Sequence, residues 1–407
     1  MNDDALKAMP GFTFPFPRHS FLLFCVFLFS LPLSIDNLKA EPFIPTDDTQ
    51  VLQQVPVPDG PLMREVRQLR QAWEKNPHNL PVALHLARRY RELGRAQGDP
   101  RYYGYAQASL GPWWNLPKPP LEVLLLRGIL RQAQHNFTGA LADLSEVLTL
   151  QPNHAQAWLA QAMIFQVQGK YERAQQSCRP LLHLTSSLVS TTCMASVASL
   201  NGRGVESYKF LDKALQQNPQ DPPRIRLWAW TVLAEMAIRL GNPESAEQHF
   251  RQAMALDRWD TYLYETYSDF LLDEARPEEV RELLQHHTKP DGLLLRLALA
   301  ERQLNSPKLV DHVKNLQTRF AENRLRDDTP HVALEARFTL KLLNRPKEAL
   351  VLAKKHWTTQ REPPDTRILL EAALLSDDFQ AARPAIEWLQ SVRLEDVRLQ
   401  KLIAQFP

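Results

Sequence analysis

The stretch of sequence that decides the fold is residues 155–182, AQAWLAQAMIFQVQGKYERAQQSCRPLL. Small and large apolar residues recur at helical spacing in two segments, which Gln168, Gly169 and Lys170 separate. The pattern predicts two antiparallel helices, each with one apolar face. Because neither helix can bury its apolar face alone, such a hairpin needs neighbours of the same kind.

The pattern recurs at a fixed period. The preceding unit starts at Leu121, which is 34 residues before Ala155, and further units start near Leu188 and Leu227. Small residues repeat where two helices must approach closely, and large ones fill the gap to the next unit. The residues that carry the pattern best are Trp158, Ala162, Phe165, Gly169, Tyr171, Ala174 and Leu181. This period and this order of residue types resemble the tetratricopeptide repeat.

The resemblance implies an all-α fold, a right-handed α-solenoid built of antiparallel helix pairs. We expect an N-terminal helical capping region over residues 63–120 and the repeat array over residues 121–290. Degenerate repeats and a C-terminal cap are expected over residues 291–407, since the terminal units of such arrays are commonly atypical. Pro180 interrupts one second helix and should kink or end it.

The N-terminus contains an uncharged run over residues 21–35, FLLFCVFLFSLPLSI. As a helix this run would be roughly 22 Å long, which is short of the roughly 30 Å bilayer core. Residues 1–40 are therefore predicted to be a cleaved signal peptide or an uncleaved anchor, with membrane contact through residues 21–35 in the second case. Both alternatives place the body outside the cytoplasm, either secreted or periplasmic, or membrane-anchored. Residues 41–62 are rich in proline and lack a helical period, which predicts a flexible linker.

The net charge and the absence of several short motifs argue against several classes of function. A net charge of +2 over 407 residues gives no footprint for nucleic acid. The sequence has no CxxC pair, HExxH, GxSxG or phosphate-binding glycine loop. We therefore predict no catalytic residue, no cofactor and no metal site, and a protein that is not an enzyme.

Two of the three cysteines, Cys178 and Cys193, lie in the repeat region. By repeat position, Cys178 is late in a second helix and Cys193 is early in the next first helix, and such helices pack as neighbours. In an oxidising compartment the two could form a disulfide that joins adjacent units. The alternative is a pair of buried free thiols.

The resemblance also implies a concave groove, lined by the first helices, that binds a peptide or a partner protein. Carried over by position, this groove would contain Leu125, Ile129, Gln132, Leu159, Met163, Gln166, Thr192, Ser196, Trp228, Glu235 and Arg239. The lysine and asparagine pairs with which chaperone-binding members hold C-terminal carboxylates are missing, and the mixed lining favours a hydrophobic peptide or helix. The alternative for each residue is a place in the core between repeats.

The sequence thus predicts an exported adaptor or scaffold that works by binding in its groove. Two other functions remain open. The chain could be an enzyme-associated subunit with a site in its C-terminal helical region, or a structural component of an envelope or transport assembly.

Overall fold

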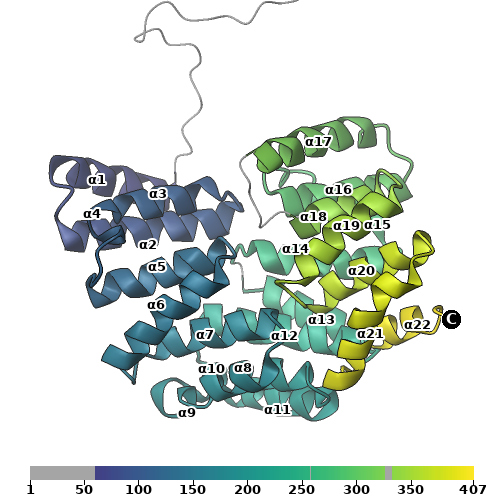
Figure 1. Cartoon of the computed structure of the whole chain (residues 1–407), viewed down its shortest axis with the longest axis horizontal. Helices are drawn as coiled ribbons and strands as arrows, with labels where there is room; N and C mark the ends of the chain where they lie inside the picture. Colours follow the sequence, from purple (N-terminus) through teal and green to yellow (C-terminus); the bar gives the residue numbers. More distant parts are fainter. Residues whose placement is uncertain (1–59, 257, 326–331) are drawn as a thin grey trace, which may run out of the picture. The chain divides into compact units, whose positions relative to one another are not determined.

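The structure is a computed structural model that describes residues 60–256, 258–325 and 332–407, and every regular element in these ranges is a helix (Figure 1). The fold class is the predicted one, an all-α solenoid of antiparallel helix pairs. The predictions for residues 1–40 and for most of the linker lie outside the described residues. Among the helices that are described, none combines the length and apolar character that a membrane crossing requires.

The first half of the array consists of helix hairpins joined by short turns. The predicted hairpin of residues 155–182 forms α7 and α8, and Gly169 ends α7 with a positive φ of 70°. Gly169 is suited to this turn because glycine has no Cβ to clash in the left-handed region. Pro180 follows the end of α8 and starts the one-turn helix α9. The helices are α1 (Pro61–Lys75), α2 (Leu80–Gln97), α3 (Arg101–Ser109), α4 (Gly111–Trp114), α5 (Leu121–Ala133), α6 (Phe137–Leu150), α7 (Ala155–Val167), α8 (Tyr171–Cys178), α9 (Leu181–Leu184), α10 (Ser187–Ser199), α11 (Gly204–Gln217), α12 (Pro223–Arg239) and α13 (Pro243–Met254).

The second half continues the same architecture with a less regular sequence. Residues 291–407, where degenerate repeats were expected, form helices from α16 to α22 in the described ranges. The helices of this half are α14 (Thr261–Asp273), α15 (Pro277–Leu284), α16 (Asp291–Gln303), α17 (Leu309–Leu325), α18 (Val332–Lys341), α19 (Pro346–Trp357), α20 (Pro363–Leu375), α21 (Phe379–Val392) and α22 (Val397–Ile403).

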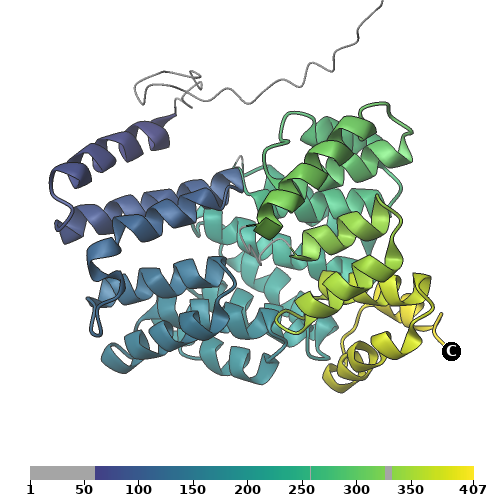
Figure 2. The ribbon, with the colours of Figure 1, turned by 45° about the horizontal axis from the view of Figure 1, so that its top comes forward.

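The C-terminal helices pack against the middle of the chain. One buried apolar cluster contains Ala162 and Tyr171 from α7 and α8, together with Leu369 from α20 and Leu389 from α21. Figures 1 and 2 show the yellow C-terminal helices beside the teal helices of the middle repeats. A C-terminal cap was expected within residues 291–407, and the last helix there is α22. It packs on α20 as a cap would, but it also reaches the α12–α13 turn.

Three turn glycines mark the path of this C-terminal segment. Gly169, Gly202 and Gly241 end the first helix of three hairpins with positive φ values of 70°, 69° and 75°. A Cβ on each would lie 2.8 Å from Trp388, 3.0 Å from Arg393 and 3.3 Å from Val397, respectively. The three glycines therefore have two roles. They allow the positive φ that each turn needs, and the lack of a side chain lets the segment from α21 to α22 pack directly on the backbone.

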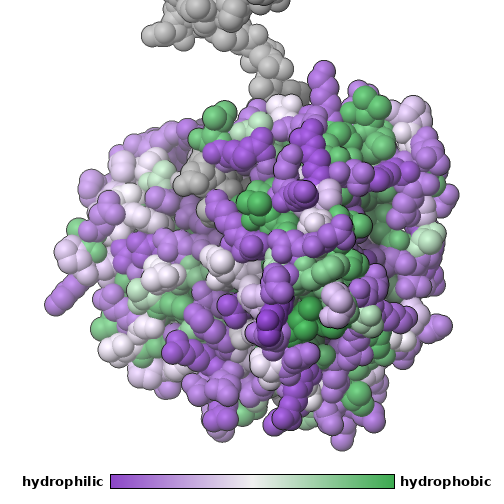
Figure 3. Space-filling model, turned by 45° about the vertical axis from the view of Figure 1, so that its right-hand side comes forward, coloured by the Kyte–Doolittle hydropathy of each residue, from purple (hydrophilic) through white to green (hydrophobic). Residues whose placement is uncertain are grey.

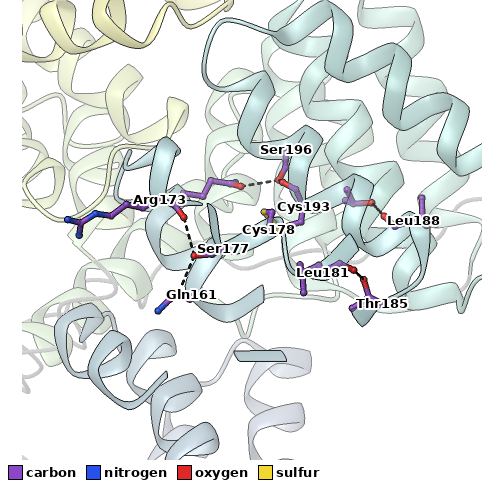
Figure 4. The surroundings of a disulfide bond; sticks show 11 residues. Gln161, Arg173, Ser177, Cys178, Leu181, Thr185, Leu188, Cys193 and Ser196 are labelled. Atoms are coloured by element: carbon purple, nitrogen blue, oxygen red, sulfur yellow. Dashed lines mark hydrogen bonds between the residues drawn. A yellow bond between two sulfur atoms is a disulfide. The ribbon is translucent and has the colours of Figure 1, made fainter. Parts of the chain in front are cut away.

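Cys178 and Cys193 are joined by a disulfide in the structure, with their Cα atoms 5.8 Å apart. Both residues are fully buried. Figure 4 shows the bond between α8 and α10, next to Ser177, whose hydroxyl lies 3.1 Å from Gln161 Oε1 and 3.0 Å from the carbonyl oxygen of Arg173. The bond thus links the second helix of one unit to the first helix of the next.

The surface seen in Figure 3 is mainly hydrophilic. Apolar residues appear on this face in small separate groups rather than as one continuous patch. Scattered apolar groups of this size are normal for a folded protein and do not by themselves indicate a binding surface.

Candidate functional site

The predicted groove residues of α5 line a cavity of about 690 Å³. Leu125 and Ile129 are largely buried and form part of its floor, and Gln132 stands on the same helix face one turn further on. A cavity of this size is typical of ligand sites, which mostly measure about 300–1,000 Å³. The structure therefore brings Leu125, Ile129 and Gln132 together in the lining of one cavity.

Arginines line this cavity, which we call the arginine pocket. Three of them, Arg88, Arg91 and Arg95, are spaced at i, i+3 and i+7, so they follow one face of α2. Arg224 comes from the first turn of α12. Arg258 precedes α14, and Arg89 completes the lining. The six arginines face only two lining carboxylates, Glu92 and Asp260, which leaves a formal charge of +4.

The pocket's carboxylates already have structural partners. Asp260 pairs with Arg95 and also accepts a hydrogen bond from the backbone N–H of Leu263, at the start of α14. Glu92 pairs with Arg89, which also pairs with Glu65. These contacts tie α2 to α14 and to α1, and they leave the other arginines without an ionic partner within the pocket.

The local field in the pocket is strongly positive. Burial lowers the pKa of Arg91, and the neighbouring charges of Arg224 and Arg95 lower it further. The pKa of Arg224 is lowered by burial and then by Arg95. Arginine nevertheless stays protonated in proteins, so the repulsion among these guanidinium groups persists in the folded chain.

The remaining groove residues lie elsewhere in the array. Thr192, Ser196 and Arg239 are buried; the hydroxyl of Thr192 donates to Leu188 O at 2.6 Å and Arg239 donates to Ser199 Oγ at 2.9 Å. Thr192 and Ser196 lie on α10, which is enclosed by α7, α8, α11 and α12, and Arg239 lies at the end of α12. Their burial leaves these side chains little surface for a partner. These three side chains therefore belong to the core between repeats, which corrects the prediction that they line the groove.

Leu159 and Trp228 pack against the apolar cluster that contains the C-terminal helices. Met163 and Gln166 are partly buried, and Gln166 Oε1 accepts a hydrogen bond from Ser196 at 3.0 Å. The prediction treated the first helices as facing an unfilled groove. In the structure, helices α18 to α22 contribute to the same apolar cluster as the helices of the middle repeats, so they pack near these positions.

The predicted groove residue Glu235 lies near the start of α20. Its carboxylate accepts a hydrogen bond from Tyr262, and burial raises its pKa. At the start of α20, burial raises the pKa of Glu362 to about 8, and the nearby carboxylates of Asp365 and Glu235 raise it as well. Asp365 in turn accepts a hydrogen bond from the backbone N–H of Glu362 at 3.2 Å. Acidic side chains of α12 and α20 thus interact across the inner side of the array.

Stability should therefore fall as pH rises from about 4.5 to about 8. Glu362 keeps its proton up to the higher value in the folded chain, whereas the unfolded chain releases it near the ordinary value of 4.5. The unfolded state binds fewer protons over this window, so its free energy drops relative to the folded state. Urea unfolding across this pH range should show a smaller loss for Glu362→Gln than for the unchanged chain. Equal losses would contradict the assignment.

Sequence reasoning missed the arginines of the pocket. The signal was present as four arginines within eight residues of α2, Arg88, Arg89, Arg91 and Arg95. A charged run on a helix is ordinarily a solvated face, and Arg224 and Arg258 join it only through the fold. The residues that the structure describes hold no group of three or more histidine, cysteine, aspartate or glutamate side chains arranged to bind a metal ion.

Comparisons with known proteins agree with the repeat pattern. The tetratricopeptide repeat family matches residues 229–258, which span most of α12 and all of α13. The match thus falls on the unit that starts at Leu227 and not on residues 155–182, where the sequence pattern is clearest. A search among curated proteins finds no relative.

Several solved structures are similar to this chain at low identity. A tetratricopeptide repeat protein from Parabacteroides merdae is 16% identical, with a TM-score of 0.42, over 59% of this chain and 92% of its own. A Rap protein complexed with competence and sporulation factor is 14% identical, with a TM-score of 0.46, over 84% and 99%. Yeast Tom70 is 14% identical, with a TM-score of 0.41, over 84% of each chain.

Proposed function

We propose that this chain is an exported scaffold that binds a segment of a partner protein at the inner surface of its N-terminal repeats. The observation that carries the proposal is the arginine pocket, because it combines the predicted groove residues of α5 with unpaired charge in a cavity of about 690 Å³. The mechanism is binding alone, with no bond made or broken in the partner. Helical repeat arrays present extended inner surfaces of this kind for partner recognition.

Export rests on two independent features. The apolar run over residues 21–35 has the length of a signal-peptide core, and retention of the run would anchor the chain to a membrane. The bond between Cys178 and Cys193 supports the same compartment, since disulfides persist in oxidising environments and are rare in the cytosol.

Photo-crosslinking in intact cells tests the binding surface. A photoreactive amino acid at Gln132, in the arginine pocket, should form an adduct with one partner protein, because that side chain faces the cavity. The matched control is Gln216, an exposed glutamine of α11 outside the pocket, which should not form this adduct. An identical adduct pattern at both positions, or none at Gln132, would remove the proposed surface.

A further inference from the structure

We infer that the arginine pocket recognises an acidic segment of the partner, in which glutamate or aspartate residues alternate with apolar ones. This inference rests on the proposed function and specifies the chemistry of its ligand. Arg91 and Arg224 would hold the carboxylates, and the α5 residues Leu125 and Ile129 would contact the apolar side chains.

The first argument is the missing partner of Arg91. Its Nε atom is buried and has no hydrogen-bond partner in the described residues, and no carboxylate there lies within 4.0 Å of Arg91 or Arg224. Burying a charge without a partner is costly. A ligand carboxylate bound in the pocket would supply the ionic partner that these guanidinium groups lack and would reduce the repulsion between Arg91 and Arg224 at the same time.

A second cavity in the same chain provides an internal comparison. It measures about 230 Å³ and is also rich in charge, but four bases face four acids in its lining. Its charges are used within the chain, since Arg367 and Arg398 both pair with Asp273 at 2.7 Å and Lys341 pairs with Glu371 at 2.8 Å. That cavity is balanced by its own ion pairs, whereas the arginine pocket has excess positive charge.

The apolar residues of the pocket lining restrict the chemical class of the ligand further. Leu125, Leu126 and Leu227 are each less than a tenth exposed and line the pocket together with the arginines. A simple inorganic anion would leave this apolar surface in contact with water. A peptide with both acidic and apolar side chains covers the floor and meets the guanidinium groups, which match carboxylates with two parallel hydrogen bonds.

Two aromatic residues line the pocket, Tyr103 and Trp259, and neither favours nucleic acid. Proteins that bind single strands stack bases on free aromatic faces. The ring of Tyr103 packs against Gly94, where a Cβ would lie 2.9 Å from it. The ring of Trp259 already lies 4.1 Å from Tyr264 and 4.2 Å from His287, measured between ring centroids. With both rings engaged in the chain's own packing, the carboxylates of a protein segment are the better match to the pocket.

Calorimetric titration of the purified chain tests the inference with two peptides. Acetyl-Glu-Leu-Glu-Glu-Leu-Glu-amide should bind at least about tenfold more tightly than its glutamine counterpart, since only the first peptide offers charged acceptors. Both ends are blocked, so a free C-terminal carboxylate plays no part. Affinity should fall as salt is added, because partly exposed charges are screened.

Substitutions locate the site. Arg91→Gln and Arg224→Gln should each weaken the glutamate peptide about tenfold, as expected for loss of a hydrogen bond to a charged group. Arg226→Gln is the matched control, because Arg226 lies on α12 two residues from Arg224 and outside the pocket lining. It should change affinity less than twofold, roughly as surface charges do. Arg224 lies at the exposed start of α12, so its variant should keep the melting temperature of the unchanged chain.

Several outcomes would overturn the inference. These are equal affinity for the two peptides, no binding of either at millimolar concentration, or tighter binding of inorganic phosphate or an RNA oligonucleotide than of the glutamate peptide. If the peptide fails while Gln132 still crosslinks to a partner, the acidic ligand is wrong and the scaffold function stands. If the peptide binds but no crosslink forms, the acidic site stands and the cellular partner surface is wrong.

Discussion

Replacing Asp143 with alanine is expected to lower the free energy of unfolding by about 3–5 kcal/mol, the usual effect of removing one partner from a buried ion pair. Asp143 is 3% exposed and lies between two arginines. Its Oδ1 atom accepts from Arg127 at 2.7 Å, and its Oδ2 atom accepts from Arg131 at 2.7 Å. The alanine variant leaves the buried Arg127 guanidinium with only the carbonyl of Trp114 as a partner.

Urea denaturation measures the effect, and two controls separate its causes. Glu387→Ala removes an exposed ion pair with Arg383 on α21 and should cost less than about 1 kcal/mol. The double variant Arg127→Met with Asp143→Leu should lose less than Asp143→Ala, because the more deeply buried Arg127 charge is removed together with its partner and only the more exposed Arg131 loses its ion pair. A loss below about 1 kcal/mol for Asp143→Ala would show that the buried pair contributes no more than a surface pair.

The hairpins themselves could be predicted because their causes are local. Ala162 and Ala174 are both fully buried where the two helices of one unit approach, and the spacing of small residues alone indicates that. Gly169 was identified as the end of α7 from the same pattern, since a turn that needs a positive φ favours glycine. Residues that contact each other and lie within about 20 positions in the sequence produce a periodic pattern that can be recognised directly.

The inner surface could be predicted only in part, because it depends on contacts between distant segments. Repeat register places both Ile129 and Thr192 on first helices, yet only Ile129 lines a cavity. The difference comes from what packs nearby. Arg361 N donates to Val167 O at 2.8 Å, and Trp388 lies against Gly169, so the C-terminal helices adjoin the middle repeats. No periodicity in the sequence encodes a contact across about 200 residues.

The arginine pocket could not be predicted from the sequence for the same reason, because it too depends on segments that are distant in the chain. Arg88, Arg91 and Arg95 share a face of α2 by spacing alone, but spacing cannot say whether that face meets solvent or other arginines. Only the fold brings Arg224, from more than 120 residues later in the chain, next to Arg91. Basic residues on one helix therefore form a candidate anion-binding site when the fold places further basic residues beside them without an equal number of carboxylates.

Removing the bond between Cys178 and Cys193 is expected to cost about 2–5 kcal/mol of unfolding free energy. The cysteines are 15 residues apart, and closing a loop of that length removes about 3 kcal/mol of chain entropy from the unfolded state. The loop contains α9, a single turn of four residues whose Leu181 is fully buried beside the bond (Figure 4). Such a short helix has little stability of its own, so hydrogen exchange should increase first at α9.

The measurement uses the variant Cys178→Ala with Cys193→Ala, and reductant supplies its matched control. Dithiothreitol should lower the urea midpoint of the unchanged chain and leave that of the double variant where it is, since the variant has no bond to reduce. Alkylation in denaturing urea and peptide mapping of protein from its own cells should find both cysteines protected until reductant is added, since unfolding exposes any free thiol. If both are alkylated without reductant, export loses the support of the disulfide. The buried positions of the two cysteines would then reflect helix packing between α8 and α10 alone.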